Sequence, residues 1–253
     1  PFVKYGCIRE QKFYDRVKDI IIFKTINGEY LTLKDYLERN KDKHKDVVYY
    51  VTDERQQAQY IKIFKENNLD AVMLDTLIDT HFIQFLESNQ SGIKFSRVDA
   101  DLSDSMKESD EDEQKANAEN DKELEKLFKE AIGDEKIKIK VEALKMPAIP
   151  GIIVLSEESR RMQDMSRIFG RSDMANMFPK EETLVLNRNN SLIKSILKLY
   201  KRGDRKDYAQ MICQHVYDLA VMSNKPLEPD MMTKFIERSN EILTRLAEAE
   251  IAG

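Results

Sequence analysis

Hydrophobic residues recur at helical spacing in two stretches near the C-terminal end of the chain. In residues 204–223 a mostly apolar stripe repeats every three or four positions, formed by Tyr208, Met211, Ile212, His215, Val216 and Leu219. In residues 229–249 a second stripe follows the same spacing, formed by Met231, Met232, Phe235, Ile236, Ile242, Leu243 and Leu246. The pattern predicts two amphipathic helices joined by a short turn.

Two helices of this kind cannot bury both stripes against one another and also exclude water. A second copy of the helix pair would complete a four-helix bundle. The pattern therefore predicts a homodimer, with an interface formed by Tyr208, Met211, Ile212, His215, Leu219, Met231, Phe235, Ile242, Leu243 and Leu246. An alternative remains open at this point, in which the pair folds back onto its own domain.

The N-terminal part of the chain has a different pattern, in which short apolar runs alternate with helical stretches. After a helical start over residues 1–18, apolar residues on both sides of Asn27-Gly28 predict a β-hairpin, and Thr32 is expected to cap a short helix. Buried strands are expected at 47–51, 71–74 and 93–98, with helices that begin at Thr52 or Asp53 and that span 79–86. Strand-helix-strand order with short links predicts parallel pairing.

An acidic, nearly aromatic-free stretch over residues 99–121 interrupts this alternation. It is expected to be a solvated linker or an exposed helix, and a binding tail for basic partners is the less favoured interpretation. Beyond it the pattern predicts a helix that ends at Gly133, followed by strands at 136–141, 152–155 and 183–186. A helix capped by Ser156 is expected between the last two strands. After the last strand, another helix is expected to be capped by Asn190 or Ser191 and to end at Gly203.

The predicted fold class is therefore mixed, α/β followed by α+β. We expect residues 1–115 to form a small αβα three-layer subdomain followed by the acidic linker. Residues 116–253 are expected to form an α+β domain that ends in the dimerising helical hairpin, with a four-helix bundle across the dimer.

Composition narrows the class of partner. The chain has 253 residues, of which 41% are hydrophobic and 34% are charged, and its net charge of −5 disfavours a nucleic-acid partner. Cys7 and Cys213 are the two cysteines, and their wide separation fits a reducing, cytoplasmic location. No apolar run is long enough to span a membrane. Because the chain opens on Pro1 without a signal-like segment, we expect it to be an excised fragment.

Motifs that carry chemistry are mostly missing from the sequence. It contains no GxGxxG, no phosphate-binding loop, no HExxH and no GxSxG. His44 is expected to be solvated and His215 to lie in an interface, so no catalytic, cofactor-binding or metal-ligating residue is assigned. An enzyme with a site at the carboxyl edge of the strands, near Thr52, Asp53 and Asp75, remains an alternative.

A methionine-rich segment over residues 160–178 is unusual enough to suggest a binding surface. Met162, Met165 and Phe169 share one helical face, and Ile168 lies in the same segment. Methionine is adaptable and is over-used at surfaces that bind many partners. Burial of this face in a core is the competing interpretation, and the sequence leaves both open.

Several separate segments resemble the ninety-kilodalton heat-shock chaperones. Residues 32–37 followed by 47–54 are similar to the segment "SLKDY…IYYITGE" of that family, and 74–79 are similar to "LTDPID". Leu186-Asn187 with 192–194 resembles "LNPxHxLVK", and 235–240 before Ile242-Leu243 resembles "FxRRxNxLL". The matches occur in the family's order from about residue 31 to 246.

The resemblance implies a three-part parent chaperone, of which this chain would hold the end of the middle domain and the whole C-terminal dimerisation domain. The residues that bind ATP and Mg²⁺, and a catalytic arginine, would lie upstream, so no cofactor is expected here. Clients of such chaperones contact a C-terminal helix that aligns with Met162, Met165, Ile168 and Phe169, and a middle-domain helix that aligns with His81 and Gln84. Bacterial members can carry Trp at the position of His81, and this chain contains no Trp.

The function expected from these observations is that of a chaperone segment that forms a homodimer and binds unfolded or partly folded proteins. Neither a nucleic acid nor a membrane is expected as a partner. A purely structural dimeric scaffold and an enzyme with an unrecognised site are the alternatives.

Overall fold

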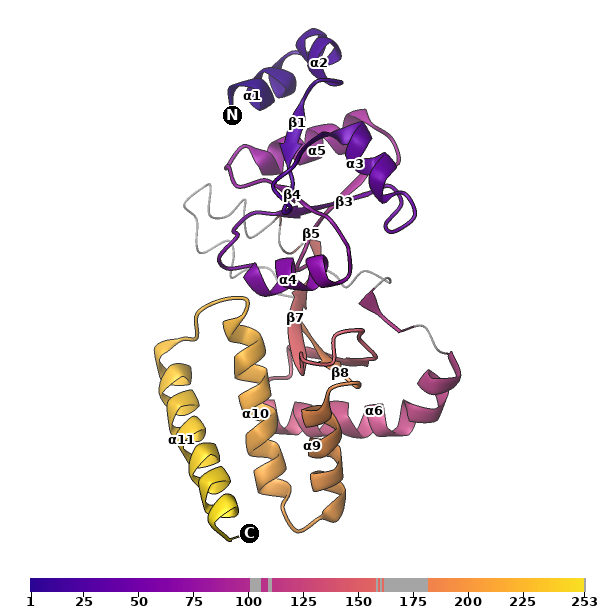
Figure 1. The fold of residues 1–253 in the computed structure, drawn as a ribbon. Coiled ribbons are helices and arrows are strands. Elements are labelled where there is room, and N and C mark those ends of the chain that lie inside the picture. The colour runs from indigo at the N-terminus through magenta and orange to yellow at the C-terminus, as the bar shows by residue number, and fades with distance from the viewer. Residues whose placement is uncertain (101–105, 109–110, 158, 160, 162–181, 253) are drawn as a thin grey trace. The chain divides into compact units, whose positions relative to one another are not determined.

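The computed structural model describes residues 1–100, 106–108, 111–157, 159, 161 and 182–252 (Figure 1). The chain divides into two compact units. The first comprises Pro1–Met106 with Val154–Glu181, and the second comprises Lys107–Ile153 with Glu182–Gly253. The predicted domain limits at residues 115 and 116 remain a prediction, and each unit is described by itself.

The first unit is built on a small parallel sheet. Its elements are α1 (Phe2–Arg9), α2 (Gln11–Val17), β1 (Ile22–Lys24), β2 (Tyr30–Thr32), α3 (Leu33–Asn40), β3 (Val47–Val51), α4 (Ala58–Glu66), β4 (Val72–Met73), α5 (Asp79–Asn89) and β5 (Lys94–Arg97). The sheet has the order β4-β3-β5, and β3 runs parallel to both neighbours. The predicted parallel pairing is therefore confirmed, as is the antiparallel β1–β2 hairpin.

Alternate residues of β3 face opposite layers, which explains the αβα arrangement. Val48 and Tyr50 share a buried cluster with Phe82 of α5 on one face of the sheet. On the other face, the ring of Tyr49 lies 4.9 Å from that of Phe64 in α4. Figure 1 shows α4 and α5 on opposite sides of these strands. A strand buried on both faces needs a continuous apolar run, and Val47–Val51 supplies it.

Two predicted helix limits in this unit are wrong. The N-terminal helix is interrupted at Glu10, whose backbone is extended with φ −139°. The helix expected from Thr52 or Asp53 begins only at Ala58. The carboxylate of Asp53 accepts hydrogen bonds from the backbone N–H groups of Arg55 and Gln56, each at 2.9 Å. These are the bonds of an N-cap, and the Gln57 N–H donates to the Asp53 carbonyl at 2.9 Å, so residues 53–57 form a separate capped turn before α4.

In the second unit, helices lie beside a three-stranded sheet whose strand order differs from the sequence order. The elements of this unit are α6 (Glu111–Ile132), β6 (Lys138–Glu142), β7 (Gly151–Leu155, of which the last two residues are counted with the first unit), β8 (Glu182–Asn187), α9 (Ser191–Arg202), α10 (Lys206–Met222) and α11 (Pro229–Ala252). The sheet order is β6-β8-β7, with β6 parallel to β8. The acidic stretch is helical over residues 111–121, where it forms the first half of α6. Mixed α+β structure is thus confirmed for the described chain.

Asn187, at the end of β8, organises the long connection between β6 and β7. Its side-chain oxygen accepts from the backbone N–H of Leu144 at 3.0 Å, and its amide nitrogen donates to the carbonyls of Met146 at 2.8 Å and Ile149 at 3.0 Å. The residue is fully buried. Because all of these partners are backbone groups, Asn187 supplies hydrogen bonds that this connection would otherwise lack.

The limits of α9 are set by local chemistry, as the sequence predicts. Gly203 ends the helix in the left-handed conformation with φ 79°, which a residue with a Cβ adopts only with strain. At the other end, the Asn190 side chain accepts from the backbone N–H of Leu192 at 2.9 Å and Ile193 at 3.3 Å. The same side chain donates to the carbonyl of Pro147 at 2.7 Å.

Replacing Asn190 with Ala is expected to lower the free energy of unfolding of this unit by about 1–2 kcal/mol, because it removes an N-cap and leaves the Pro147 carbonyl without its donor. Urea denaturation followed by circular dichroism measures the effect. Ser191→Ala is the matched control, since Ser191 is exposed and next in sequence. Equal midpoints for the two variants would contradict the capping role.

Candidate dimer interface

Helix α10 has two apolar faces, and the structure uses one of them inside the second unit. Ala209, Cys213, Val216 and Ala220 are buried at spacings of three and four residues. This inner face packs against α6 and α9. The Gln214 side chain strengthens the contact with α6 by donating to the Ala131 carbonyl at 2.7 Å. Val216, which the sequence pattern placed in the apolar stripe of residues 204–223, therefore belongs to the core of the unit.

The inner residues are small, which explains the choice of face. Alanine and cysteine at every turn let the backbone of α10 approach a neighbouring helix closely. The burial of Cys213 also raises the pKa of its thiol, so that it remains protonated at neutral pH.

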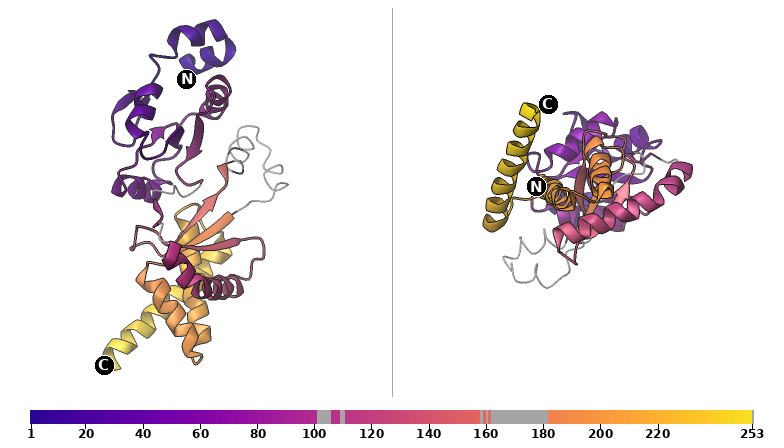
Figure 2. Two further views of the ribbon diagram at one scale, coloured as in Figure 1. Left: turned by 90° about the vertical axis from the view of Figure 1, so that its right-hand side faces the viewer. Right: turned by 90° about the horizontal axis from the view of Figure 1, so that it is seen from below.

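Helix α11 packs on the other side of α10, away from α6 and α9 (Figure 2). The rings of His215 and Phe235 are stacked, with centroids 4.7 Å apart and an angle of 3° between their planes. Arg238 pairs with Asp218 at 2.6 Å, and their side chains are only 13% and 7% exposed. These contacts turn the side of α11 that carries Phe235 and Arg238 towards α10.

The adjacent side of α11 is apolar and open. Ile236, Leu243 and Leu246 are 52%, 61% and 58% exposed. On α10, Leu219 and Met222 are 43% and 40% exposed. We call these five side chains the outer stripe. No side chain of α11 between Pro229 and Ile251 is fully buried. Several large apolar side chains exposed along one helix pair mark a candidate interaction site.

The predicted interface residues divide into two groups in the structure. Leu219, Leu243 and Leu246 are exposed and available for an intermolecular contact. The half-buried members are Tyr208, Met211, Ile212, His215, Met231, Phe235 and Ile242. Phe235 and His215 already contact each other within the chain. Ile236, seven residues before Leu243, was in the predicted stripe but not in the predicted interface, and its spacing could have identified it. The interface itself remains a prediction.

The structure also brings together a charged pair that the sequence pattern did not single out. Asp218 is not a member of the apolar stripe of residues 204–223, yet it is buried where it meets Arg238. No signal within either helix pairs these two residues, because they are 20 positions apart and meet only when the hairpin closes.

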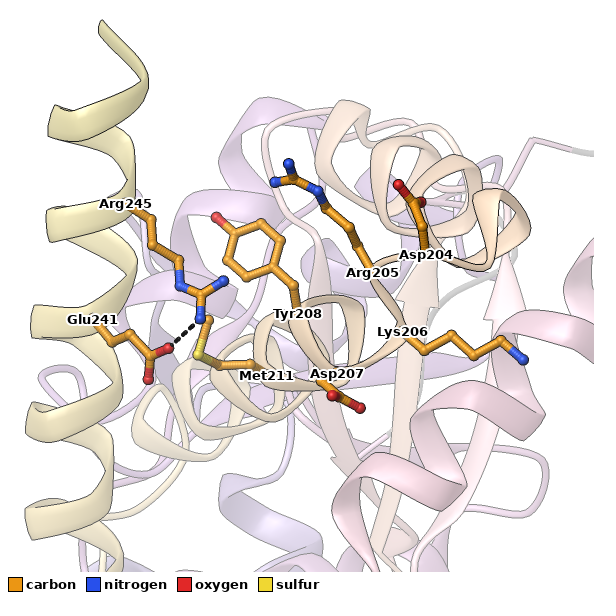
Figure 3. A pocket seen from close by; sticks show the side chains of 8 residues that line it. All are labelled: Asp204, Arg205, Lys206, Asp207, Tyr208, Met211, Glu241 and Arg245. Atoms are coloured by element: carbon orange, nitrogen blue, oxygen red, sulfur yellow. Dashed lines mark hydrogen bonds and ion pairs between the residues drawn. The ribbon is translucent and has the colours of Figure 1, made fainter. Parts of the chain in front are cut away.

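A hollow of about 460 Å³ lies where the beginning of α10 faces α11 (Figure 3). The Arg245 guanidinium lies over the Tyr208 ring at 5.0 Å and also pairs with Glu241 at 2.6 Å. Figure 3 shows Lys206 pointing away from this group. The other lining residues are Asp204, Arg205, Asp207 and Met211. The hollow combines an aromatic ring and a thioether with charges of both signs on its rim.

His215 is the titratable group most closely involved in closing the hairpin. Its Nδ1 atom is buried and has no hydrogen-bond partner among the described residues. Burial lowers the pKa of His215, the nearby charge of Arg238 lowers it further, and Asp218 opposes both. The neutral imidazole is therefore the form that fits between Asp218, Arg238 and Phe235.

Acidification is expected to weaken the α10–α11 contact. Since the pKa of His215 is lower in the folded state than in the unfolded state, the unfolded state takes up the proton first. Stability therefore falls as pH drops below about 6.5, the unperturbed histidine value. Amide exchange of α11 between pH 7.5 and 5.5 measures the change. In His215→Gln the pH dependence of this exchange should be smaller, and an unchanged dependence would contradict the assignment.

The predicted client-binding residues are only partly visible. Met162, Met165, Ile168 and Phe169 lie outside the described residues. Just before them, the predicted Ser156 cap is confirmed, because the Ser156 hydroxyl accepts from the Ser159 backbone N–H at 3.2 Å. His81 and Gln84 are exposed on α5 and lie near the exposed Leu77. Their contact with clients remains a prediction.

The residues considered for an enzyme site at the strand edge have structural contacts. The backbone N–H groups of Thr52 and Asp53 donate to the Gln57 side-chain oxygen at 2.8 Å and 3.0 Å. Within the part of the chain that the structure describes, no group of three or more His, Cys, Asp or Glu side chains is placed to hold a metal ion. Of the helices in these described residues, none is both long and apolar enough to cross a bilayer.

Comparison with known proteins places the chain in a family. The family model described as Hsp90 protein matches residues 1–251. A protein of Bacteroides fragilis (strain YCH46) named chaperone protein htpG is 28% identical over 205 residues, which cover 78% of this chain and 30% of the relative. Its namesake in Porphyromonas gingivalis (strain ATCC 33277) is 30% identical over 207 residues with the same coverage. A third, from Chlorobium phaeobacteroides, is 24% identical over 251 residues, or 96% of this chain and 39% of the relative.

The chain belongs to the Hsp90 protein family, because the family model covers nearly all of it. It spans about 30% of the length of the first curated relatives that it matches. The resemblance seen in the sequence motifs is confirmed.

Proposed function

We propose that this chain is the part of a molecular chaperone that forms a homodimer and helps to bind unfolded proteins. Family membership and the names of the relatives support the chaperone function. The outer stripe of α10 and α11 is the observation that carries the dimer proposal. Its five side chains remain 40–61% exposed in a single chain, although the same helix pair is otherwise closed by stacking and ion pairing.

A second copy of the hairpin is the partner that fits this stripe best. The stripe runs along the length of α11 with Ile236, Leu243 and Leu246 at spacings of seven and three residues, which is the spacing of a helix-packing seam. A two-fold axis would set the stripe of one copy against the same stripe of the other. The result is a four-helix bundle, in which α10 and α11 of each copy contribute one half.

Client binding is proposed for the methionine-rich face of Met162, Met165, Ile168 and Phe169, with His81 and Gln84 as a second contact. The double variant Met165→Asp with Phe169→Asp is expected to weaken suppression of aggregation of a heat-unfolded enzyme while leaving the dimer intact, because charges replace the adaptable apolar contacts. Light scattering measures aggregation, and sedimentation reports the dimer.

Two further results would separate this proposal from its alternatives. Unchanged suppression of aggregation by the double variant would remove the client surface and favour a purely structural dimer. Amide exchange of residues 160–178, with and without the unfolded enzyme, gives the same distinction without substitutions. Protection that appears only with the unfolded enzyme supports the client surface.

We further propose that this chain acts in the cytoplasm. We also propose that it neither binds nor hydrolyses ATP by itself, so that any ATP-driven step belongs to other parts of a longer parent protein. The two buried free cysteines fit a reducing compartment. Titration calorimetry with MgATP tests the nucleotide statement. Binding at micromolar concentration would overturn it and would favour the enzyme alternative.

A further inference from the structure

Strand β5 forms an edge of the sheet in the first unit. On its inner side, Lys94 N–H donates to the Asp46 carbonyl at 2.9 Å and Val98 N–H donates to the Tyr50 carbonyl at 3.0 Å. Because alternate residues of a strand direct their backbone groups to opposite sides, Phe95 and Arg97 direct theirs outward. An outward row of N–H and C=O groups is a template for pairing with another strand.

Three charged side chains occupy this outward row. Phe95 N–H donates to Glu87 Oε1 at 2.8 Å, and the Phe95 carbonyl accepts from Arg161 Nη2 at 3.0 Å. Arg97 N–H donates to Glu157 Oε2 at 2.8 Å. Along the edge the side chains thus present an acceptor, a donor and an acceptor. The backbone of an added β-strand would present the same order of groups.

The three side chains also bind one another, and we call them the ionic clamp. The Arg161 guanidinium donates to Glu87 at 2.6 Å and 2.9 Å and to Glu157 at 2.8 Å. The Tyr50 hydroxyl completes the group by donating to Glu157 at 2.7 Å. The clamp side chains are only 18–23% exposed. Every polar group that contacts the edge therefore has a partner while the clamp is closed.

The charge of the clamp depends on Arg161. Burial by itself would raise the pKa of Glu87, but hydrogen bonds from Arg161 and from Phe95 N–H hold the pKa below its usual value. Without the arginine, two partly buried carboxylates would face the edge with no cation in the clamp. The clamp should therefore open as a unit when Arg161 is lost.

We propose that the outer edge of β5 is a docking site for an extended polypeptide strand, and that the ionic clamp closes this site. An extended strand is the proposed occupant because its backbone groups match the clamp side chains one to one. Each hydrogen bond that a clamp side chain makes to the backbone of Phe95 or Arg97 can be exchanged for a backbone hydrogen bond from the added strand. The released carboxylates and guanidinium return to water, which solvates them. The site is separate from the proposed dimer interface, and its test does not depend on dimerisation.

The rival explanation is a permanent cap that only prevents edge-to-edge aggregation. The probe that distinguishes the two is an acetylated and amidated heptapeptide of alternating threonine and valine with a lysine at each end. A second peptide of the same sequence, N-methylated at every other residue, cannot form the ladder of hydrogen bonds and is the matched control for the probe.

In the Arg161→Ala variant, the amides of Phe95 and Arg97 are expected to exchange at least ~10-fold faster than in the wild type, as the edge loses its partners. Addition of the heptapeptide should restore protection at Phe95 and Arg97. The heptapeptide should also bind the variant at least ~10-fold more tightly than the wild type, and the N-methylated peptide should do neither.

Two further variants keep the test decisive. Arg39→Ala breaks an exposed ion pair with Glu29 elsewhere in the same unit and should behave as the wild type. If Arg161→Ala does not fold, as judged by circular dichroism, Glu87→Gln replaces it, since it weakens the clamp while keeping an acceptor for Phe95 N–H. The proposal is overturned if the opened edge gains no protection from the heptapeptide, or if the N-methylated peptide protects it equally.

Discussion

The double variant Ile236→Glu with Leu243→Glu is expected to be monomeric at concentrations where the wild type is a dimer. Both side chains belong to the outer stripe and are 52% and 61% exposed in the single chain. Glutamate at these positions is therefore compatible with the folded monomer. In a four-helix bundle the same positions would bury four carboxylates across the two copies, without partners. Each unpaired buried charge costs several kcal/mol, so the dissociation constant should rise at least ~1000-fold.

Analytical ultracentrifugation over a range of protein concentrations measures this change. Phe235 is a poorer choice for substitution than Ile236, because its ring stacks on His215 within the chain and its loss would disturb the hairpin itself. The matched control is Ile20→Glu with Leu77→Glu, two exposed apolar residues of the first unit. The control should stay dimeric. A wild-type chain that sediments as a monomer at micromolar concentration would refute the dimer directly.

Replacing Arg238 with Met is expected to cost roughly 3 kcal/mol of local stability in the hairpin, because it leaves the Asp218 carboxylate buried without its partner. Asp218 has a side chain only 7% exposed, and methionine preserves the aliphatic part of the arginine. Amide exchange of α10 and α11 at a fixed protein concentration reports the change, since it measures local opening without requiring that the whole chain unfold in one step.

A double-mutant cycle isolates the interaction energy between Asp218 and Arg238. Asp218→Leu combined with Arg238→Met should recover most of the loss, since an apolar pair of similar volume avoids the cost of desolvating two charges. Lys126→Met is the control for a surface pair. Its partner Glu130 lies one turn away on α6 and both side chains are exposed, so a change below ~0.5 kcal/mol is expected. If Arg238→Met behaves like Lys126→Met, the Asp218–Arg238 pair does not hold the hairpin closed.

Much of the secondary structure follows from local sequence. The apolar run at Val47–Val51, the Asn27-Gly28 turn, the Asn190 cap and the Gly203 stop each depend on neighbours within a few residues, and each was predicted. The late start of α4 was not predicted, because Asp53 and Gln57 bind backbone amides in a separate turn before the helix. Side-chain turns of this kind have no hydrophobic signature.

The candidate interface was predictable in part for the same reason. Periodicity identifies the apolar positions of α10 and α11, including the exposed Leu243 and Leu246. It does not show that Phe235 and His215 contact each other within one chain, or that Asp218 is buried against Arg238. Those contacts join two helices, and their geometry depends on how the turn between the helices sets their relative rotation.

By itself, the sequence determined the family, the positions of most helices and strands, and which side chains of the C-terminal hairpin are apolar. Only the tertiary structure decided which apolar face of α10 is used internally. The small residues Ala209, Cys213 and Ala220 fit closely against α6 and α9, so that face was buried and the face with Leu219 remained open beside α11. Periodicity measures how often apolar residues recur, whereas burial depends on whether a neighbouring surface has a matching shape.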